Sequence, residues 1–184
     1  NSKKVWEKSV RNVRVPEDGV ACDLLTADFF HAATDVQFLA LKLTGADGKT
    51  VSENFYWRSN NGYEGPKTLT GPCTAGFQSL NNMKQVSLKY TTKVIPQKAP
   101  CYLVEVTVKN NSKNIAFFNQ LHLFGTDNQP IRGAFYSDNF FTLLPGESKT
   151  VIIDCPLHRI SSKELTLKVS GWNVPEQVLK LKKL

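Results

Sequence analysis

The sequence has few of the residue types that most often bind metal ions or carry enzyme chemistry. Its 184 residues include three histidines and four cysteines. No two cysteines form a C-x-x-C pair, and no histidine lies at zinc-like spacing from one, so we expect no metal site. The chain also lacks a P-loop, a dinucleotide fingerprint and the G-x-S-x-G turn of hydrolases. We therefore expect no cofactor.

Long apolar runs are also missing. No run approaches the roughly 18 residues that a membrane-spanning helix needs, which argues against a membrane partner. Apolar residues make up 41% of the chain and charged residues 21%, a composition typical of folded globular proteins. The chain starts at Asn1 without a signal peptide or Met, so we expect a piece cut from a longer polypeptide.

The formal net charge is +7, from 23 Lys and Arg against 16 Asp and Glu. An anionic partner such as nucleic acid is one interpretation of this excess. However, the basic residues are scattered and cluster only at residues 3–4 and 180–183. No basic stripe flanked by aromatic residues is present, so we expect no nucleic-acid partner.

Alternation of apolar and polar residues recurs along the chain. Residues 85–94, 102–109 and 164–170 each alternate with a period of two, which predicts strands with one buried face and one wet face. No segment keeps a helical period for three turns. The predicted fold class is therefore all-β, with antiparallel immunoglobulin-like sandwiches. Turn signals separate the strands at residues 46–49, 110–113, 125–128 and 145–147.

A shift in composition divides the chain. We expect residues 58–84, rich in Gly, Asn, Ser, Thr and Pro, to be a linker with a short helical turn near 77–80. Residues 85–184 would then form one complete sandwich of seven or eight strands. Residues 1–57 would hold a partial domain, with strands near 4–14, 19–27, 36–44 and 50–57. Because 36–44 is apolar on both sides, we expect an open face or edge and self-association through residues 1–57.

The four cysteines, Cys22, Cys73, Cys101 and Cys155, allow three pairings. A chain of this size and apolar content does not need disulfides to fold, so we expect free thiols. Cys101 and Cys155 are the only pair we would consider for a disulfide, because both flank strands of the predicted sandwich.

Candidate site residues are weakly marked. Flat aromatic rings stack on sugar faces, and planar polar groups bind hydroxyls. Dense aromatic residues at strand ends equally fit packing between domains. The candidates for carbohydrate or interdomain contact are Trp57, Tyr136, Asp138 and Trp172.

We assign no catalytic residue from the sequence. A hydrolase pair would need two converging carboxylates, and spacing cannot show convergence among Asp23, Glu53, Glu105 and Asp138. His122 lies in a predicted strand, where a hydrogen-bonded structural histidine is the favoured interpretation. The tripeptide 110–112 matches the N-glycosylation acceptor, a short and common pattern.

Three stretches together resemble the C-terminal region of glycoside hydrolase family 2 enzymes, in the branch of exo-β-D-glucosaminidases and β-mannosidases. Residues 41–57 resemble the closing hairpin of the immunoglobulin-like domain that follows the catalytic barrel. Residues 77–83 (FQSLNNM) are similar to the linker before the last domain. Residues 136–148 (YSDNFFTLLPGES) and 169–173 (VSGWN) resemble the core of that last sandwich.

The resemblance implies that the acid/base and nucleophile glutamates lie on an upstream TIM barrel, so none transfers to this chain. It also implies that the first domain begins before Asn1. The chain would then be a non-catalytic accessory region of a periplasmic or secreted retaining hydrolase, with that barrel as its partner. The alternative is an independent carbohydrate-binding or adhesion module.

Overall fold

The structure, a computed structural model, divides into two compact units, residues 3–82 and residues 83–184 with Ser2. The division lies near the C-terminal end of the predicted linker, 58–84. Residues 60–75 of that stretch are outside the described part, so the predicted domain limits stay a prediction. The structure describes residues 2–26, 34–59, 76–95, 101–125, 127–156 and 165–181.

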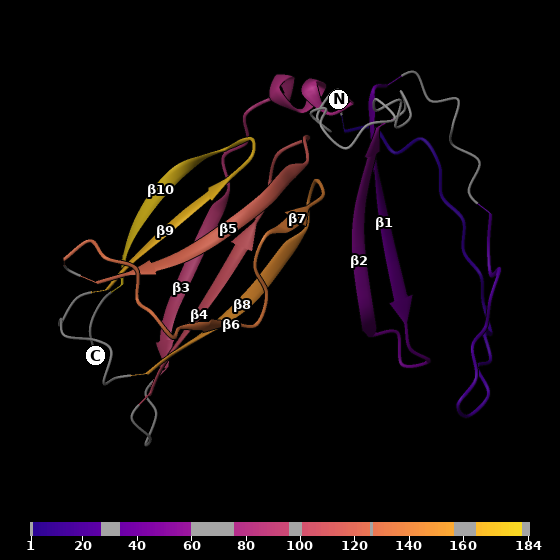
Figure 1. Ribbon diagram of the computed structural model, residues 1–184, viewed down its shortest axis with the longest axis horizontal. Coiled ribbons are helices and arrows are strands. Elements are labelled where there is room, and N and C mark those ends of the chain that lie inside the picture. The colour runs from indigo at the N-terminus through magenta and orange to yellow at the C-terminus, as the bar shows by residue number, and fades with distance from the viewer. Residues whose placement is uncertain are drawn as a thin grey trace, which may run out of the picture. The chain divides into compact units, whose positions relative to one another are not determined.

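The unit of residues 3–82 contains one antiparallel hairpin, β1 (Val36–Thr44) and β2 (Thr50–Ser59) (Figure 1). The predicted turn connects the two strands. Gly48 has a φ of +78° and donates its N–H to the Gly45 carbonyl at 3.0 Å. Because glycine adopts this φ without strain, the turn follows from local backbone chemistry. A short 3-10 helix, η1 (Gln78–Asn82), lies where a helical turn was expected.

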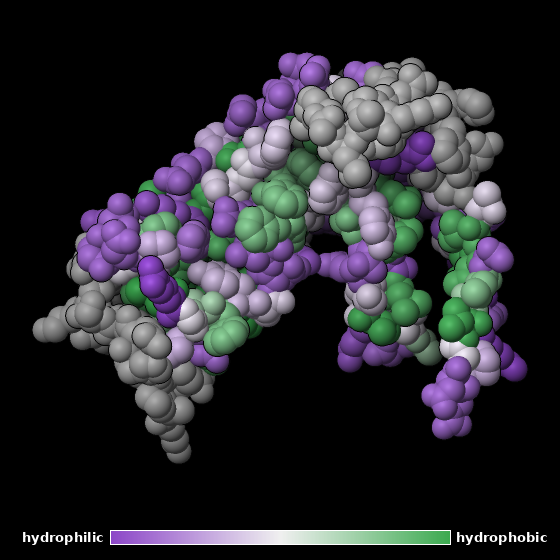
Figure 2. Space-filling model, in the orientation of Figure 1, coloured by the Kyte–Doolittle hydropathy of each residue, from purple (hydrophilic) through white to green (hydrophobic). Residues whose placement is uncertain are grey.

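Both faces of the hairpin carry apolar side chains. Phe38 and Phe55 pack on one face with their ring centroids 5.6 Å apart. On the other face Leu41 and Leu43 are 40% and 56% exposed. Figure 2 shows apolar side chains along this hairpin among hydrophilic ones. The expected open face is therefore present.

Two of the four strands predicted for residues 1–57 are wrong. The described residues 2–26 contain no strand at 4–14 or at 19–26. Alternation alone does not make a strand, because a strand needs a neighbour to complete its backbone hydrogen bonds. Left-handed residues also break the extension, at Asn12, Asp18 and Asp23.

The unit of residues 83–184 is a sandwich of two four-stranded antiparallel sheets. No α-helix occurs in the described residues, in agreement with the predicted all-β class. One sheet has the order β10 (Val174–Leu181), β9 (Leu165–Gly171), β5 (Ala116–Phe124), β7 (Phe141–Leu143). The other has the order β3 (Lys89–Ile95), β4 (Cys101–Lys109), β8 (Ser148–Pro156), β6 (Phe135–Tyr136).

The sandwich core follows the predicted alternation. In β4, Val104, Val106 and Val108 are fully buried, while the residues between and beside them on the other face are partly or fully exposed: Leu103, Glu105, Thr107 and Lys109. Burying a Val, Leu or Ile side chain stabilises a fold by roughly 1.5–3 kcal/mol. The largest buried side chains include Leu121, Leu123, Leu143, Ile153 and Leu167.

The turn between β7 and β8 occurs where a turn was predicted and has the type II form. Gly146 occupies its third position with a φ of +84°, and the Glu147 N–H donates to the Leu144 carbonyl at 3.1 Å. Pro145 fixes φ at the second position. The Glu147 carboxylate accepts the Leu144 N–H at 2.8 Å, which closes the turn from the other side.

Candidate functional site

The four residues predicted to contact carbohydrate or another domain are divided between the two units, one in residues 3–82 and three in residues 83–184. Trp57, 41% exposed, lies in the hairpin opposite Phe38. Tyr136, Asp138 and Trp172 belong to the sandwich. Trp172 is 52% exposed, whereas Tyr136 and Asp138 are tied into the sandwich by internal bonds.

Tyr136 supports a neighbouring strand. Its hydroxyl oxygen accepts the Leu123 N–H of β5 at 2.9 Å. Burial raises the pKa of Tyr136 although this hydrogen bond lowers it. The phenol therefore remains neutral at physiological pH and connects β6 to β5.

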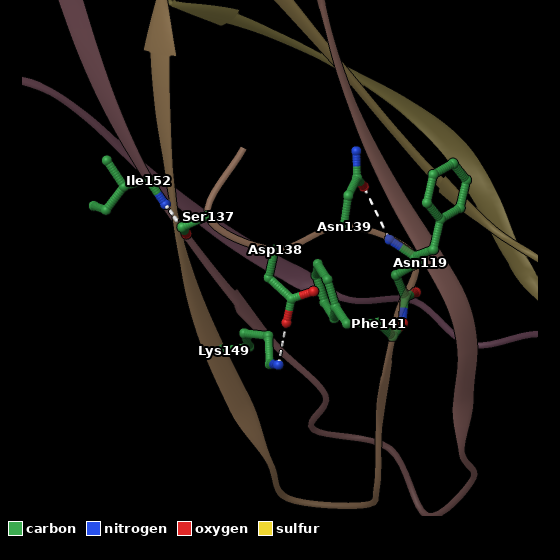
Figure 3. Close-up of polar contacts among 8 residues, drawn as sticks. Asn119, Ser137, Asp138, Asn139, Phe141, Lys149 and Ile152 are labelled. Carbon is green, nitrogen blue, oxygen red and sulfur yellow. Dashed lines mark hydrogen bonds and ion pairs between the residues drawn. The ribbon is translucent and has the colours of Figure 1, made fainter. Parts of the chain in front are cut away.

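Asp138 forms an ion pair with Lys149 of β8 (Figure 3). The Lys149 Nζ also lies 5.6 Å from the centroid of the Phe141 ring. Both charged groups are only partly exposed, with 39% of the Asp138 side chain and 22% of the Lys149 side chain accessible. The carboxylate therefore fastens the segment after β6 to β8.

The neighbours of Asp138, Ser137 and Asn139, form hydrogen bonds with backbone groups 15 and 18 residues away in the sequence. Ser137 Oγ accepts the Ile152 N–H at 2.9 Å, as Figure 3 shows. Asn139 Oδ1 accepts the Leu121 N–H at 2.9 Å, and its Nδ2 donates to the Leu121 carbonyl at 3.0 Å. Asn139 thus replaces a strand partner for β5.

Four aromatic rings gather at the end of β5, in what we call the aromatic cluster: Phe117, Phe118, Phe140 and Trp172. Ring centroids are 5.7 Å apart for Phe117 and Phe118, 5.2 Å for Phe118 and Phe140, and 6.4 Å for Phe117 and Trp172. The paired rings are tilted by 46°, 42° and 59°. Phe117 is buried, while Phe118 and Phe140 are 36% and 48% exposed.

Two rings of the aromatic cluster stand on left-handed backbone. Phe118 has a φ of +55° and Phe140 a φ of +57°. Such a φ is uncommon for bulky side chains and strains the backbone. At Phe118 the register of β5 against β7 shifts, between Ala116 and Asn119. This irregularity directs a ring out of the sheet.

Buried asparagine side chains hold the backbone behind the aromatic cluster. Asn173, next to Trp172, accepts the Phe117 N–H on Oδ1 at 2.9 Å. Its Nδ2 donates to the carbonyls of Lys84 and Ile115, both at 2.8 Å. The Trp172 N–H donates to the Phe117 carbonyl at 2.9 Å. One amide therefore joins three segments of the sandwich.

Asn119 completes this support on the other side. Its Nδ2 donates to the carbonyls of Ala116 and Phe141, at 2.8 and 2.9 Å. Gly171 leaves room for it, because a Cβ at that position would lie 2.8 Å from Asn119 Oδ1 and 3.0 Å from the Phe117 carbonyl. These residues were not among the predicted site residues; at Asn119 the available signal was a polar amide at an inward position of an apolar strand.

Asn110, the formal glycosylation acceptor, is fully buried. Its Nδ2 donates to the carbonyls of Asn114 at 2.8 Å and Leu143 at 3.0 Å. Glycosylation modifies this nitrogen, so the folded chain does not offer it. Asn110 instead closes the turn between β4 and β5.

The candidate carboxylates lie on different elements. In the strand register, Glu53 lies opposite Lys42 in the hairpin, and Glu105 lies opposite Lys93 between β4 and β3. The Asp138 carboxylate forms the ion pair with Lys149. Within the described ranges, no group of three or more His, Cys, Asp or Glu side chains could hold a metal ion. Likewise, no helix among those residues is long and apolar enough to cross a membrane.

The remaining nucleophilic and titratable candidates are the histidines and the cysteines. The His122 ring lies 4.7 Å from the Phe124 ring on β5, and His31 and His158 fall outside the described residues. Cys22 and Cys155 are free, as predicted, the first exposed and the second buried. Cys73 and the Cys101 side chain lie outside the described part.

Comparison with known proteins identifies the sandwich. The model of the family described as the exo-β-D-glucosaminidase Ig-fold domain matches residues 69–174. The exo-β-D-glucosaminidase of Streptomyces avermitilis is 28% identical over 95% of this chain, and that of Amycolatopsis orientalis is 26% identical over 74%. The chain spans 20% and 14% of the length of these two relatives.

A solved structure has the same fold. The exo-chitosanase CsxA of Amycolatopsis orientalis superposes with a TM-score of 0.71 at 24% identity, over 86% of this chain and 20% of the other. This likeness concerns the fold, and the family match covers more than half of the chain. The chain therefore belongs to the exo-β-D-glucosaminidase Ig-fold domain family, a non-catalytic accessory region of glycoside hydrolases.

Proposed function

We propose that this chain is the C-terminal accessory region of a family 2 glycoside hydrolase that removes terminal β-linked glucosamine. The catalytic carboxylates would lie on an upstream TIM barrel, and the sandwich would brace that barrel or shape its rim. The observation that supports this is the family match over residues 69–174, together with relatives named exo-β-D-glucosaminidase that are several times longer.

The finer choice of substrate rests on the relatives. Those named above are exo-β-D-glucosaminidases. We therefore propose exo-β-D-glucosaminidase activity for the parent, in preference to the β-mannosidase activity of the same branch. Sugar contacts would lie in the barrel, and nothing in this chain discriminates between the two sugars. We also propose that the parent is periplasmic or secreted, which fractionation of the source cells would test.

The test is an activity assay of the polypeptide encoded by the complete gene beside the 184-residue chain. Aryl β-glucosaminide, β-mannoside and β-galactoside are the substrates. We expect the complete polypeptide to hydrolyse the glucosaminide fastest and the 184-residue chain to be inactive. Turnover by the repurified chain, or a complete gene without a barrel, would contradict the proposal. Binding of the isolated chain to a glycan array would favour the independent module instead.

A further inference from the structure

We propose that the aromatic cluster (Phe117, Phe118, Phe140 and Trp172) is the surface by which the sandwich docks onto the catalytic domain of its parent polypeptide, outside these 184 residues. This inference rests on the proposed function and adds the contact site to it. Three observations support it: the strained backbone under two rings, the rigid support behind them, and the size and shape of the exposed patch.

The strain indicates that the exposed rings have a purpose outside the sandwich. Phe118 and Phe140 are held at φ values of +55° and +57°, where Gly or Asn would fit better. Such strain persists only where the surroundings impose it, and it is concentrated at functional sites. Because the two rings remain 36% and 48% exposed, their burial within the sandwich is incomplete. A covering surface would add the missing burial.

The support behind the rings fixes their positions before any partner arrives. Asn139, which directly precedes Phe140, forms two hydrogen bonds with the backbone of Leu121. Asn119 follows Phe118 and clamps two carbonyls, and Asn173 follows Trp172 and clamps two more. Aromatic anchors on a rigid backbone lose little conformational entropy on binding, as a docking surface requires.

The shape of the aromatic cluster disfavours a sugar as its occupant. Its contacting rings are tilted by 42–59°, so they form a faceted surface and not a flat platform for stacking pyranose rings. The nearby carboxylate of Asp138 is already paired with Lys149. A protein surface with apolar side chains between polar ones fits such facets better.

The size of the patch favours a tethered domain over a second copy of the chain. Three side chains with 150–250 Å² each, exposed by a third to a half, present about 300 Å². A stable complex of separate proteins buries about 800 Å² per partner, whereas contacts between domains of one chain begin near 600 Å² in total. The relatives have about 80% of their length outside the matched part, which supplies such a domain.

Hydroxyl-radical footprinting of the complete polypeptide and of the 184-residue chain tests the inference. We expect oxidation of Trp172 and Phe140 to be at least threefold slower in the complete polypeptide. Phe135 of β6, 72% exposed on the same sandwich, is the internal control and should react alike in both. Equal rates at Trp172 in the two proteins would overturn the inference. Protection of Trp172 by glucosamine oligomers, or only upon dimerisation, would also overturn it.

Phe140→Asn separates docking from folding. Asn tolerates the left-handed φ, so the melting temperature of the 184-residue chain should not fall. In the complete polypeptide the variant should restore fast oxidation of Trp172, while the matched variant Phe135→Asn should not. If Phe140→Asn leaves Trp172 shielded, the docking surface lies elsewhere. If Phe140→Asn removes the shielding of Trp172 but the wild-type complete polypeptide has no glucosaminidase activity, the docking surface is supported and the proposed function is refuted.

Discussion

Apolar and polar residues alternate in both units of this chain, but the apolar side chains are buried in one unit and exposed in the other. In the sandwich, inward side chains such as Val104 and Leu121 are at most 1% exposed, because a second sheet covers them. In the hairpin unit, Leu41 and Leu43 alternate just as regularly and yet are 40% and 56% exposed. Among the described residues of 3–82, Leu80 is the one buried hydrophobic side chain.

The difference shows that alternation specifies a strand face but not its cover. A hairpin of two strands is marginal by itself, and three or more strands or a packed partner are needed for independent stability. The sandwich contains both sheets, so it has its own core. The hairpin has two strands, too few to form a core by themselves. The predictions below test this contrast between a self-sufficient unit and a dependent one.

The largest effect is expected from matched truncations of one leucine in each unit. Leu121→Ala should destabilise the sandwich by about 2–5 kcal/mol, because it leaves a cavity in a packed core. Leu43→Ala should change the unfolding free energy of the hairpin unit by less than about 0.5 kcal/mol. Urea unfolding is followed by Trp172 fluorescence for the sandwich, with Trp6 and Trp57 replaced by Phe, and by Trp57 fluorescence for the hairpin unit, with Trp6 and Trp172 replaced by Phe. Equal effects of the two substitutions would refute the contrast.

The next effect concerns the buried amides. Asn173→Ala removes three hydrogen bonds, to Lys84, Ile115 and Phe117, and leaves their backbone groups unsatisfied. We expect a loss of about 2–4 kcal/mol in the unfolding free energy of the sandwich. The control is Asn111, which is exposed and lies next to the buried Asn110. Asn111→Ala should leave the unfolding free energy nearly unchanged. A neutral Asn173→Ala would show that water replaces these bonds.

How far the sequence predicts the fold depends on the range of the interactions. The strands at 36–44 and 102–109 and the Gly146 turn follow from local chemistry, and all three occur as expected. The strands expected near 4–14 and 19–27 do not form in the described residues, since strand pairing requires a neighbour that alternation cannot reveal.

The candidate site was harder to predict for the same reason. Trp172 was predicted to contact carbohydrate or another domain, but Phe118 and Phe140 were not, because nothing local marks a phenylalanine that will adopt a left-handed φ. The longest-range hydrogen bonds of Asn119 and Asn173 join residues 22 and 89 positions apart. Such contacts follow from the assembled sandwich and not from neighbouring residues.

A smaller effect should separate the thiols of the two units. Burial, with a further contribution from Asp154, raises the pKa of Cys155 to about 11 from a usual value of 9.0. The folded state therefore disfavours the thiolate, so the sandwich is fully stabilised by this group below pH 9 and loses that stability between pH 9 and 11. Exposed Cys22 should react at once with a thiol reagent at pH 8, and Cys155 only upon unfolding. Equal reaction rates would contradict the buried position.

The smallest effect is the association that we propose for the hairpin. Its exposed apolar face should produce weak self-association through residues 1–57, with a mass that rises with concentration in light scattering. Leu41→Lys with Leu43→Glu should abolish the rise without altering the sandwich. A wild-type chain that stays monomeric up to millimolar concentration would refute this proposal and leave the parent polypeptide as the cover.

Hydrogen exchange of the 184-residue chain tests the central contrast most directly. We predict that backbone amides in β4, β5 and β8 are protected to nearly the full unfolding free energy of the sandwich. Amides that pair β1 with β2 should exchange at least a hundredfold faster, because local opening of a poorly covered hairpin suffices. Equal protection in the two units would contradict the account, since it would show that the hairpin has a stable core of its own.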